Sequence, residues 1–394
     1  MIILAIETSC DETAIAVVKS NLKGTKCTVL SHTVLSQIDL HREYGGVFPM
    51  MAKREHARVM ITLLEKCLRD AGCIKKNKSK SVLDKRTISK VSKTLAREEI
   101  VAIEMIKLFE ENTISKLGAV AVTSGPGLEP ALWVGINTAL ALGAITSLPI
   151  YPINHMEGHI IAATLKSSKD AQGKDVYALP PIKVPSLALL ISGGHTELVH
   201  IKGSGKYKII GQTRDDAVGE AFDKVARMLG LPYPGGPEIS MLASAARKRG
   251  AIVPREMLLP RPMIHSKDFD FSFSGLKTAV LYKIPKYKTF GQTQKELLAL
   301  DFENTVTEVL IKKTLSAVHK IKAKSVIVGG GVSANSHIRL ELTKKLKSVC
   351  SLYIPGHSLS TDNALMIAVT AMTHLAQGRK PKSKIVANGN WHLS

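Results

Sequence analysis

Two histidines four residues apart are the first candidates for chemistry in this sequence. They are His155 and His159, the ends of the segment HMEGH. On a helix, residues four apart lie on one face, about 40° from each other around the axis. Two imidazoles placed in this way can bind one metal ion, and Gly158 between them leaves room for close approach. The spacing therefore predicts a metal site on a helix from about His155 to Leu165.

The glutamate in this segment argues against a zinc protease. In the protease motif HExxH, the glutamate follows the first histidine directly and serves as the general base. Here Glu157 is two residues from each histidine, about 200° around the helix from the first one. We therefore expect its carboxylate to point away from a shared metal.

Asp362 is the candidate for a third ligand. It lies in the segment Thr361-Asp362-Asn363, at the start of a helix predicted at about 361–376. All three residue types are good helix N-caps, and spacing alone favours that role. The alternative is that the Asp362 carboxylate completes a His/His/Asp set with open coordination positions.

Other acidic residues leave their roles open. Asp11 and Glu12 lie in the first predicted hairpin, either as turn residues or as carboxylates that face a cleft. The acids at the start of the predicted helix 218–229 suit its dipole. Asp223 lies further along that helix, where the dipole does not explain it, so we expect it to contact a ligand.

Two glycine clusters indicate a nucleotide site. Residues 192–196, SGGHT, lie between two predicted strands, and residues 329–335, GGGVSAN, follow a buried strand and open a helix. Glycine backbone and a helix N-terminus both favour a bound anion. Neither cluster has the spacing of a P-loop or of a dinucleotide fold. Together they predict a nucleotide site of another type.

The elements that carry these residues repeat in order. Three strands, a helix, a strand and a helix occur first in residues 2–165, and a similar order begins at residue 186. The first strands are predicted at Ile2–Glu7, Ala14–Val18 and Cys27–Ser36. The strands of the second half are predicted at Ser186–Ile191, Thr196–Ile201 and Lys208–Gln212. The repeat predicts an α/β fold of two similar lobes with a cleft between them.

Composition limits the class of protein and its partners. The chain has 394 residues, 45% hydrophobic and 22% charged, which is typical of a folded globular protein. Its five cysteines form no CxxC pair, so we expect a reducing cytoplasm. The formal net charge of +21 favours a polyanionic partner, either nucleic acid or an anionic membrane surface.

Two segments need separate interpretations. Residues 130–156 carry no full formal charge, but polar residues and Pro149 interrupt them, so we predict a buried helix at about 131–147 rather than a membrane span. Residues 75–97 hold nine basic residues and one acid. Ile88, Val91 and Leu95 keep a helical spacing there, which predicts a basic helix or helical hairpin extending to about Thr113. It is either a solvated insertion or a contact for a phosphate backbone.

Seven motifs, in order along the chain, resemble one family: IETSCDET, HMEGH, LLISGGHT, DDAVGEAFDKVARMLGLPYPGGP, DFSFSGLKT, GGGVSAN and STDN. The chain resembles the universal tRNA N6-adenosine threonylcarbamoyltransferase family from Met1 to about Ala376, apart from the basic insertion. Ser240 is typical of the bacterial, TsaD-like members, where archaeal and eukaryotic relatives tend to have Glu. Ala364 departs from the usual glycine after STDN.

The resemblance implies a two-lobed actin/sugar-kinase-like (ASKHA) fold with duplicated ribonuclease-H-like lobes. We expect the first lobe at 1–150, including the insertion at about 74–113, and the second lobe at 151–376 with the metal and nucleotide sites. Residues from about 377 to 394 are expected to pack back on the first lobe.

The resemblance also implies an activity and its site residues. The family transfers a threonylcarbamoyl group from threonylcarbamoyl-AMP to N6 of adenosine 37 in tRNAs that read codons beginning with A, forming t6A and releasing AMP. By resemblance, His155, His159 and Asp362 hold one divalent metal ion, Fe²⁺ or Zn²⁺, which overturns the capping role for Asp362. The residues implied for the adenylate, or for an ATP- or ADP-like nucleotide in the same site, are Leu190, Ile191, Ser192, Gly193, Gly194, Asp223, Gly236 and Asn335. Asp11 or Glu12 is our hypothesis for the group that positions the adenosine amine or accepts its proton.

Partners follow from the same resemblance. Bacterial members form a heterodimer with an inactive paralogue of the same fold, work with an ATPase partner, and receive their substrate from a threonylcarbamoyl-AMP synthase. We expect the paralogue to dock on the first lobe, near the insertion, with tRNA as the second substrate and no membrane association. The alternatives are a small-molecule kinase of the same fold, which has no use for the HMEGH and TDN residues, and a non-catalytic tRNA-binding scaffold, which is expected to lose them.

Overall fold

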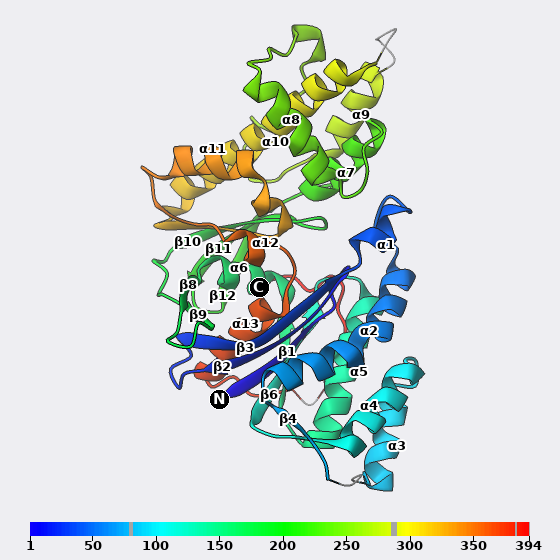
Figure 1. Cartoon of the computed structure of the whole chain (residues 1–394). Helices are drawn as coiled ribbons and strands as arrows, with labels where there is room; N and C mark the ends of the chain where they lie inside the picture. The colour runs from blue at the N-terminus through cyan, green and yellow to red at the C-terminus, as the bar shows by residue number, and fades with distance from the viewer. Residues whose placement is uncertain (79–81, 285–289, 383, 394) are drawn as a thin grey trace. The chain divides into compact units, whose positions relative to one another are not determined.

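The computed structural model describes residues 1–78, 82–284, 290–382 and 384–393. It divides into two compact units (Figure 1). The first consists of Met1–Asp39, Val47–Pro180 and Asp362–His392, and the second chiefly of Leu40–Gly46 and Pro181–Thr361. This division differs from the predicted boundary at residue 150, because residues 151–180 and the segment after residue 361 pack with the first unit.

The first unit is built on a seven-stranded sheet with the order β7-β6-β1-β2-β3-β9-β8. Its strands are β1 (Ile2–Glu7), β2 (Glu12–Ser20), β3 (Lys26–Ser36), β6 (Leu117–Gly125), β7 (Ile150–Asn154), β8 (Lys166–Lys169) and β9 (Asp175–Ala178). Its helices are α2 (Pro49–Asp70), α3 (Lys85–Thr94), α4 (Glu99–Glu111), α5 (Glu129–Thr146), α6 (His155–Ala163) and α13 (Ala364–Ala376). A short helix, α1 (Ile38–Arg42), spans the point at which the chain passes from the first unit to the second.

Helices cover both faces of this sheet, which explains why β1 is a continuous apolar run. Leu4 and Ile6 of β1 share a core cluster with α2 and α5. On the opposite face, three alanines lie side by side: Ala5 of β1 pairs with Ala16 of β2 and with Ala121 of β6. Small side chains let α13 pack closely on β1 and β2. The sheet thereby fixes the start of α13 near the ends of the central strands.

The uncharged segment forms the helix α5, as predicted. Pro130 lies in its first turn, where proline is favoured, and Ser147 ends it in a left-handed conformation with φ 59°. Its packing against β6 and α2 accounts for the lack of charge. In the described part of the chain, we find no helix with the length and hydropathy required to cross a membrane.

The predicted basic hairpin is present as α3 and α4. The short strands β4 (Ile74–Lys76) and β5 (Asn112–Ile114) pair at its base in a separate two-stranded sheet. Val91 and Leu95 are fully buried in the core cluster of the first unit. The insertion is therefore packed onto the body of this unit.

The second unit has a five-stranded sheet with the order β12-β11-β10-β13-β14. Its strands are β10 (Ser186–Ile191), β11 (Thr196–Gly203), β12 (Lys206–Gln212), β13 (Ser325–Gly329) and β14 (Ser351–Tyr353). Its α-helices are α7 (Val218–Met228), α8 (Gly235–Lys248), α9 (Ser274–Lys283), α10 (Gln292–Ile321), α11 (Ser336–Leu346) and α12 (His357–Ser360), and its 3₁₀ helices are η1 (Arg255–Met257) and η3 (Gly331–Ala334).

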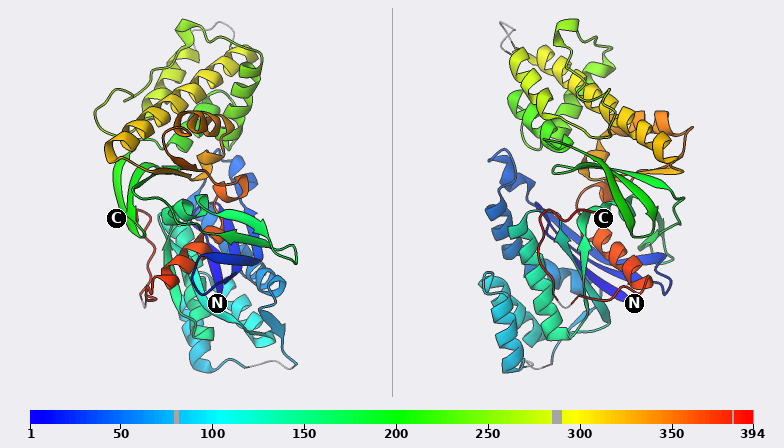
Figure 2. Two further views of the ribbon diagram at one scale, coloured as in Figure 1. Left: turned by 90° about the vertical axis from the view of Figure 1, so that its left-hand side faces the viewer. Right: turned by 180° about the vertical axis from the view of Figure 1, so that it is seen from behind.

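The two sheets, both drawn in the views of Figure 2, share one topology. In the first unit, β1-β2-β3 form an antiparallel meander, and β6 and β7 add in parallel on the other side of β1. In the second, β10-β11-β12 form the meander, and β13 and β14 add in parallel beside β10. The predicted α/β class and the predicted repeat are both confirmed, and this strand order is that of the duplicated ribonuclease-H-like unit.

Candidate metal centre

The two histidines of HMEGH lie in the first turns of α6. Asn154, the last residue of β7, caps this helix by accepting hydrogen bonds from the backbone N–H groups of Met156 and Glu157. The cap starts α6 directly at His155, so both imidazoles lie at the end of a buried strand. His155 is 6% exposed and His159 is 1% exposed. The strand–cap–helix connection therefore places a pair of buried imidazoles on one side of the helix.

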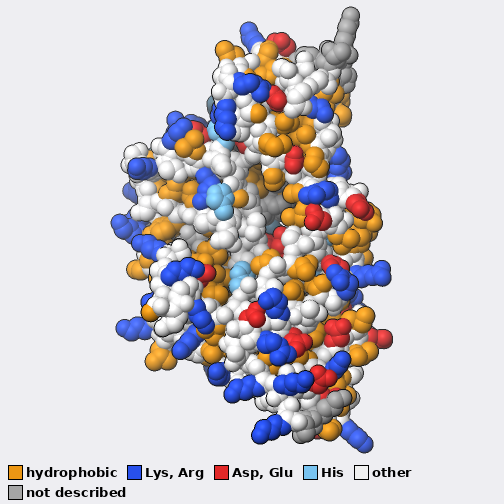
Figure 3. Space-filling model, viewed as in Figure 1, with side chains coloured by type: hydrophobic (Ala, Val, Ile, Leu, Met, Phe, Trp, Pro, Cys, Tyr) orange, Lys and Arg blue, Asp and Glu red, His pale blue; other side chains and the backbone are white. Residues whose placement is uncertain are grey.

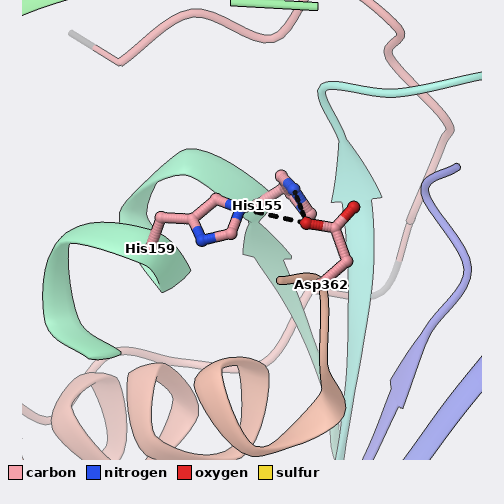
Figure 4. Close-up of side chains that lie close together, drawn as sticks. All are labelled: His155, His159 and Asp362. Atoms are coloured by element: carbon pink, nitrogen blue, oxygen red, sulfur yellow. Dashed lines mark hydrogen bonds and ion pairs between the residues drawn. The ribbon is translucent and has the colours of Figure 1, made fainter. Parts of the chain in front are cut away.

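Asp362 lies opposite this pair, just before α13 (Figure 4). Asn363 caps α13 by accepting a hydrogen bond from the backbone N–H of Met366. Asp362 does not cap the helix, and its Oδ1 lies 3.2 Å from His155 Nε2 and 3.1 Å from His159 Nε2. The three residues form a group of metal-ligand type, with ligand atoms within 4.8 Å of one another.

These distances suit a shared cation. Nitrogen and oxygen ligands lie about 2.1 Å from a bound transition metal, so two of them are about 3.0 to 3.4 Å apart for right-angled to tetrahedral geometry. The observed separations of Asp362 Oδ1 from the two Nε2 atoms fall in that interval. Two imidazoles and one carboxylate are a donor set that zinc and iron(II) both accept.

A second carboxylate orients His155 from the other side of its ring. Glu7, at the end of β1, is fully buried, and its Oε2 lies 3.0 Å from His155 Nδ1. Ser9 Oγ lies 3.1 Å from the same nitrogen. The backbone N–H of Ser9 and the hydroxyl of Thr123 donate to the two oxygens of Glu7, each at 2.5 Å. An imidazole that donates from Nδ1 to this carboxylate presents the lone pair of Nε2 toward Asp362.

Glu7 and Ser9 were missed by the sequence analysis. Both lie within IETSCDET, but His155 follows Glu7 by 148 positions, so nothing local in the sequence points to the contact. The signal available was a glutamate at the end of an otherwise apolar strand. A carboxylate at such a position is buried and must find partners.

Negative charge accumulates around the cluster. Burial lowers the pKa of His155, but the Asp362 and Glu7 carboxylates outweigh it and raise that pKa well above its ordinary value. Burial raises the pKa of Asp362, and the two histidines outweigh it and lower that pKa. Burial together with the Asp11 and Asp362 carboxylates raises the pKa of Glu12 to about 10. Clustered carboxylates of this kind favour a bound cation.

The predicted direction of Glu157 is confirmed. Its Oε2 lies 3.0 Å from His374 Nε2 on α13, on a side of α6 away from Asp362. Gly158 faces α13 as well, and a Cβ there would lie 3.2 Å from Met366 Cγ. The close approach that this glycine allows is therefore that of α13. The zinc-protease alternative lacks its general base.

Glu12 is the first residue of β2 and Asp11 directly precedes it; Asp362 is close enough for its charge to act on Glu12. A buried histidine of α2 holds the turn before them. Its Nε2 lies 3.0 Å from the Cys10 carbonyl oxygen, which makes Nε2 the donor, and its Nδ1 lies 2.7 Å from Thr13 Oγ1. This residue, His56, is fully buried and was not noticed in the sequence. The predicted carboxylates are thus on a turn whose backbone is fixed.

The residues predicted to bind a nucleotide all belong to the second unit. Leu190 and Ile191 end β10, and residues 192–194 form the turn to β11, closed by the hydrogen bond from Ser192 N–H to the His195 carbonyl. A Cβ on Gly330 would lie 2.4 Å from Ile191 O, and one on Gly219 would lie 2.6 Å from Ser192 O. The loop after β13 and the start of α7 therefore meet the glycine turn at one end of the sheet.

The other residues predicted to contact a nucleotide form hydrogen bonds within the protein. Asp223 Oδ1 accepts a hydrogen bond from the Gly235 N–H at 2.7 Å, which fixes the turn before Gly236. Asn335 caps α11 through Oδ1, and its amide nitrogen donates to Ser240 and Glu303. These bonds position the ends of α8 and α11. A role in binding an adenylate stays a prediction for these residues.

The repeated sheet order places the chain in the actin/sugar-kinase-like class of α/β proteins. The chain matches the model of the family "TsaD: tRNA N6-adenosine threonylcarbamoyltransferase" over residues 28–80 and 93–369. It is 38% identical over 384 residues to the protein of that name from Acidovorax sp. (strain JS42), covering 97% of this chain and 94% of the relative. It is 39% identical over 389 residues to that from Geobacillus kaustophilus, covering 98% and 95%. The chain belongs to the tRNA N6-adenosine threonylcarbamoyltransferase family.

Solved structures outside the family are more distant. The activator of the 2-hydroxyisocaproyl-CoA dehydratase from Clostridium difficile with bound ADPNP aligns with a TM-score of 0.46 at 13% identity, covering 98% of this chain and 100% of that chain. The ROK hexokinase from Thermus thermophilus aligns with a TM-score of 0.41 at 14% identity, covering 96% and 100%. Similarity at this level carries no information about activity.

Proposed function

We propose that this chain transfers the threonylcarbamoyl group of threonylcarbamoyl-AMP to N6 of adenosine 37 in tRNA, forming t6A. One observation carries the proposal: the family match over residues 28–80 and 93–369, a range that contains all three residues of the metal-ligand cluster. In the reaction, a bond forms between N6 and the carbamoyl carbon, and the bond from that carbon to the phosphate oxygen breaks. AMP leaves with the electron pair, and N6 loses one proton.

We assign His155, His159 and Asp362 to one divalent ion, Fe²⁺ or Zn²⁺. Bound there, such an ion would act as a Lewis acid toward phosphate and carbamoyl oxygens. Glu7 supports the assignment, because its carboxylate holds the His155 ring by Nδ1 and keeps Nε2 directed at Asp362. The burial of both imidazoles excludes bulk water from that side of the cluster.

Asp11 and Glu12 are assigned to the adenosine amine. N6 of adenosine is a poor nucleophile, so orientation contributes as much as proton removal. The rigid turn around Cys10, held by His56, supports this assignment, because a carboxyl group on a fixed backbone can hold an amine in one orientation. The raised pKa of Glu12 keeps its carboxyl protonated near neutral pH, so Asp11 is assigned as the proton acceptor and Glu12 as a positioning group. Replacing Asp11 or Glu12 by Ala should reduce turnover and leave the metal content unchanged. Unchanged turnover in both variants would remove them from the reaction.

The second unit is assigned to the adenylate. The turn 192–194 has open space above Gly193 and Gly194, and its glycines let a phosphate approach the backbone closely. Gly236 also has no atom within 4 Å of a Cβ position. An ATP- or ADP-like nucleotide would occupy the same place. Further partners are proposed from the family resemblance: an inactive paralogue docking on the first unit, an ATPase and an upstream synthase, in the cytoplasm.

A reconstituted reaction tests the function. Threonine, bicarbonate, ATP, unmodified tRNA and the presumed partners are combined with the chain, and t6A is measured by nucleoside mass spectrometry. The unchanged chain should produce t6A, the variant His155→Ala should not, and His319→Ala, which removes an exposed histidine of α10, should behave as the unchanged chain does. An unchanged chain without activity would refute the transfer. An active His155→Ala would refute the role of the cluster.

A further inference from the structure

Helix α3 presents a continuous basic surface that the proposed reaction does not use. Its members, together called the basic face, are Lys85, Arg86, Lys90, Lys93 and Arg97, and all five are exposed. At 100° per residue the four helical members fall within an arc of about 140°. None of the five forms an ion pair with the residues that the structure describes. Four such cations on one helix, with Arg97 shortly beyond its end, are a local excess of positive charge.

The opposite side of α3 is fixed to the first unit. Val91 and Leu95 are fully buried and pack with α4 and α5. Asp84 caps the helix by accepting a hydrogen bond from the Thr87 N–H at 2.9 Å. The cations are therefore carried on a helix of fixed orientation, and binding a partner there costs little backbone entropy.

A buried acid holds the connection between α3 and α4. Glu98 is 4% exposed, lies 3.1 Å from Lys53 Nζ on α2, and accepts a hydrogen bond from Asn137 Nδ2 on α5 at 3.0 Å. The connection is thus tied to two helices of the body of the unit. Arg97, its neighbour in sequence, points outward from this anchored position.

The basic face continues into a groove. A cavity of about 660 Å³ opens beside the C-terminal end of α3, between the α3–α4 connection and helices α2 and α5. Lys93 and Arg97 of the basic face line it together with Met50 and Trp133; the other charged lining residues are Glu129 and the ion pair of Lys53 with Glu98. Cations beside an apolar and aromatic surface are typical of sites that bind a nucleic-acid backbone with its sugars and bases.

The composition of the basic face favours RNA over a protein partner. Protein interfaces are depleted of lysine at their centre and contain apolar or aromatic anchors. The exposed residues of α3 are Lys, Arg and Ser only, whereas the neighbouring α4 exposes Ile100 and Ile103. We propose that the basic face and its groove bind the phosphate backbone of the tRNA substrate, outside the modified nucleotide.

This inference rests on the proposed function for the identity of the RNA, and it adds a contact that the family match does not contain. Residues 81–92, which include much of α3, lie outside the matched ranges. The helix lies at the end of the first unit away from α6 (Figures 1 and 2). Lys and Arg side chains are visible at that end of the unit in Figure 3. The contact should therefore strengthen tRNA binding without altering the chemical step.

The test removes the charges and keeps the fold. The variant carries Gln in place of Lys85, Arg86, Lys90 and Lys93, and the control variant carries Gln in place of Lys166, Lys174, Lys202 and Lys206, which are also exposed. Both lose four positive charges, so a difference between them reports position and not net charge. Binding of full-length chain to unmodified tRNA is measured by fluorescence anisotropy between 50 and 300 mM salt, and circular dichroism checks the fold.

The expected effect is a change in salt dependence. Each phosphate contact contributes about 0.7 to 0.9 to the slope of log K against log salt, so four lost contacts should flatten the slope by about 3. At 50 mM salt the affinity of the α3 variant should fall by about tenfold or more. In the reconstituted reaction, KM for tRNA should rise and kcat should stay unchanged.

Several outcomes would overturn the inference. One is an equal slope of log K against log salt for the α3 variant and the control variant. A second is no measurable tRNA binding by the unchanged chain at low salt. A third is an α3 variant that binds tRNA as the unchanged chain does but no longer forms a complex with a protein partner. The last result would assign α3 to an acidic protein instead. Failure of the proposed function is separate, because it would show as an unchanged chain that binds tRNA through α3 and forms no t6A.

Discussion

Replacing Glu7 by Gln should weaken metal binding without removing a ligand. The substitution keeps the size of the side chain but removes the charge that faces His155 Nδ1 at 3.0 Å. It also places an amide NH₂ where the carboxylate now accepts from either the Ser9 N–H or the Thr123 hydroxyl, so one donor loses its acceptor. Loss of an outer partner of a metal-bound histidine typically costs 10- to 100-fold in metal affinity, which is about 1.4 to 2.7 kcal/mol.

Glu157 provides the matched control. It is a buried carboxylate on the same helix as the two histidines, and it also lies 3.0 Å from a histidine nitrogen, but that partner is His374. Glu157→Gln should therefore destabilise the fold to a similar degree, about 1 to 3 kcal/mol for an unsatisfied buried group, and leave metal affinity unchanged.

The assay is a titration of metal-depleted protein with Zn²⁺ in competition with a chromophoric chelator, with urea unfolding of each metal-free variant beside it. A Glu7→Gln variant that folds and binds Zn²⁺ within about threefold of the unchanged chain, well short of the tenfold loss expected, would contradict this role of Glu7. So would a Glu157→Gln variant that weakens Zn²⁺ binding as much as Glu7→Gln does.

Two further predictions concern the second unit and the thiols. Gly330→Ala should lower the free energy of unfolding in urea by about 2 to 4 kcal/mol, because φ at this residue is +91° and the new Cβ would lie 2.4 Å from Ile191 O. The control is Gly331→Ala, which has open space around its Cβ position and should change the free energy of unfolding far less. Burial raises the pKa of Cys27 and of Cys67 to about 11, so at pH 8 iodoacetamide should label both slowly in native protein and rapidly in urea. The folded pKa of each thiol exceeds its unfolded value near 9. The contribution of the protonated thiols to folding stability is therefore complete below about pH 9 and should be lost as pH rises through about 11. Equal labelling rates in native and unfolded protein would contradict the burial of the two thiols.

The features that could be predicted from the sequence are those that depend on a local pattern of residues. The 3.6-residue period places His155 and His159 on one helical face wherever that helix lies, and the apolar runs predict the strands of both sheets. The role of Asp362 could not be assigned from its neighbours, because Thr, Asp and Asn all cap helices. In the structure Asn363 is the N-cap of α13, and Asp362 faces the histidines.

Long-range contacts explain what the sequence analysis missed. The contact between Glu7 and His155 joins residues 148 apart, and β-strand pairing with a late helix brings them together. The boundary at residue 150 was misplaced for the same reason, since β8 and β9 extend the first sheet from beyond it. The hairpin β8–β9, the helix α9 and the strand β14 were also not predicted. Short polar strands such as β8 carry no apolar alternation by which to recognise them.

The path of the chain between the units has a consequence for biosynthesis. The segment that supplies Asp362 and α13 follows the whole of residues 181–361, yet it packs on β1 and β2, which are synthesised long before it. While a ribosome extends the chain, the alanine-lined side of the first sheet stays uncovered, and a newly made His155–His159 pair lacks its carboxylate. Until Asp362 has left the ribosome the proposed set of metal ligands is incomplete, and a product truncated before Asp362 should aggregate through that uncovered surface.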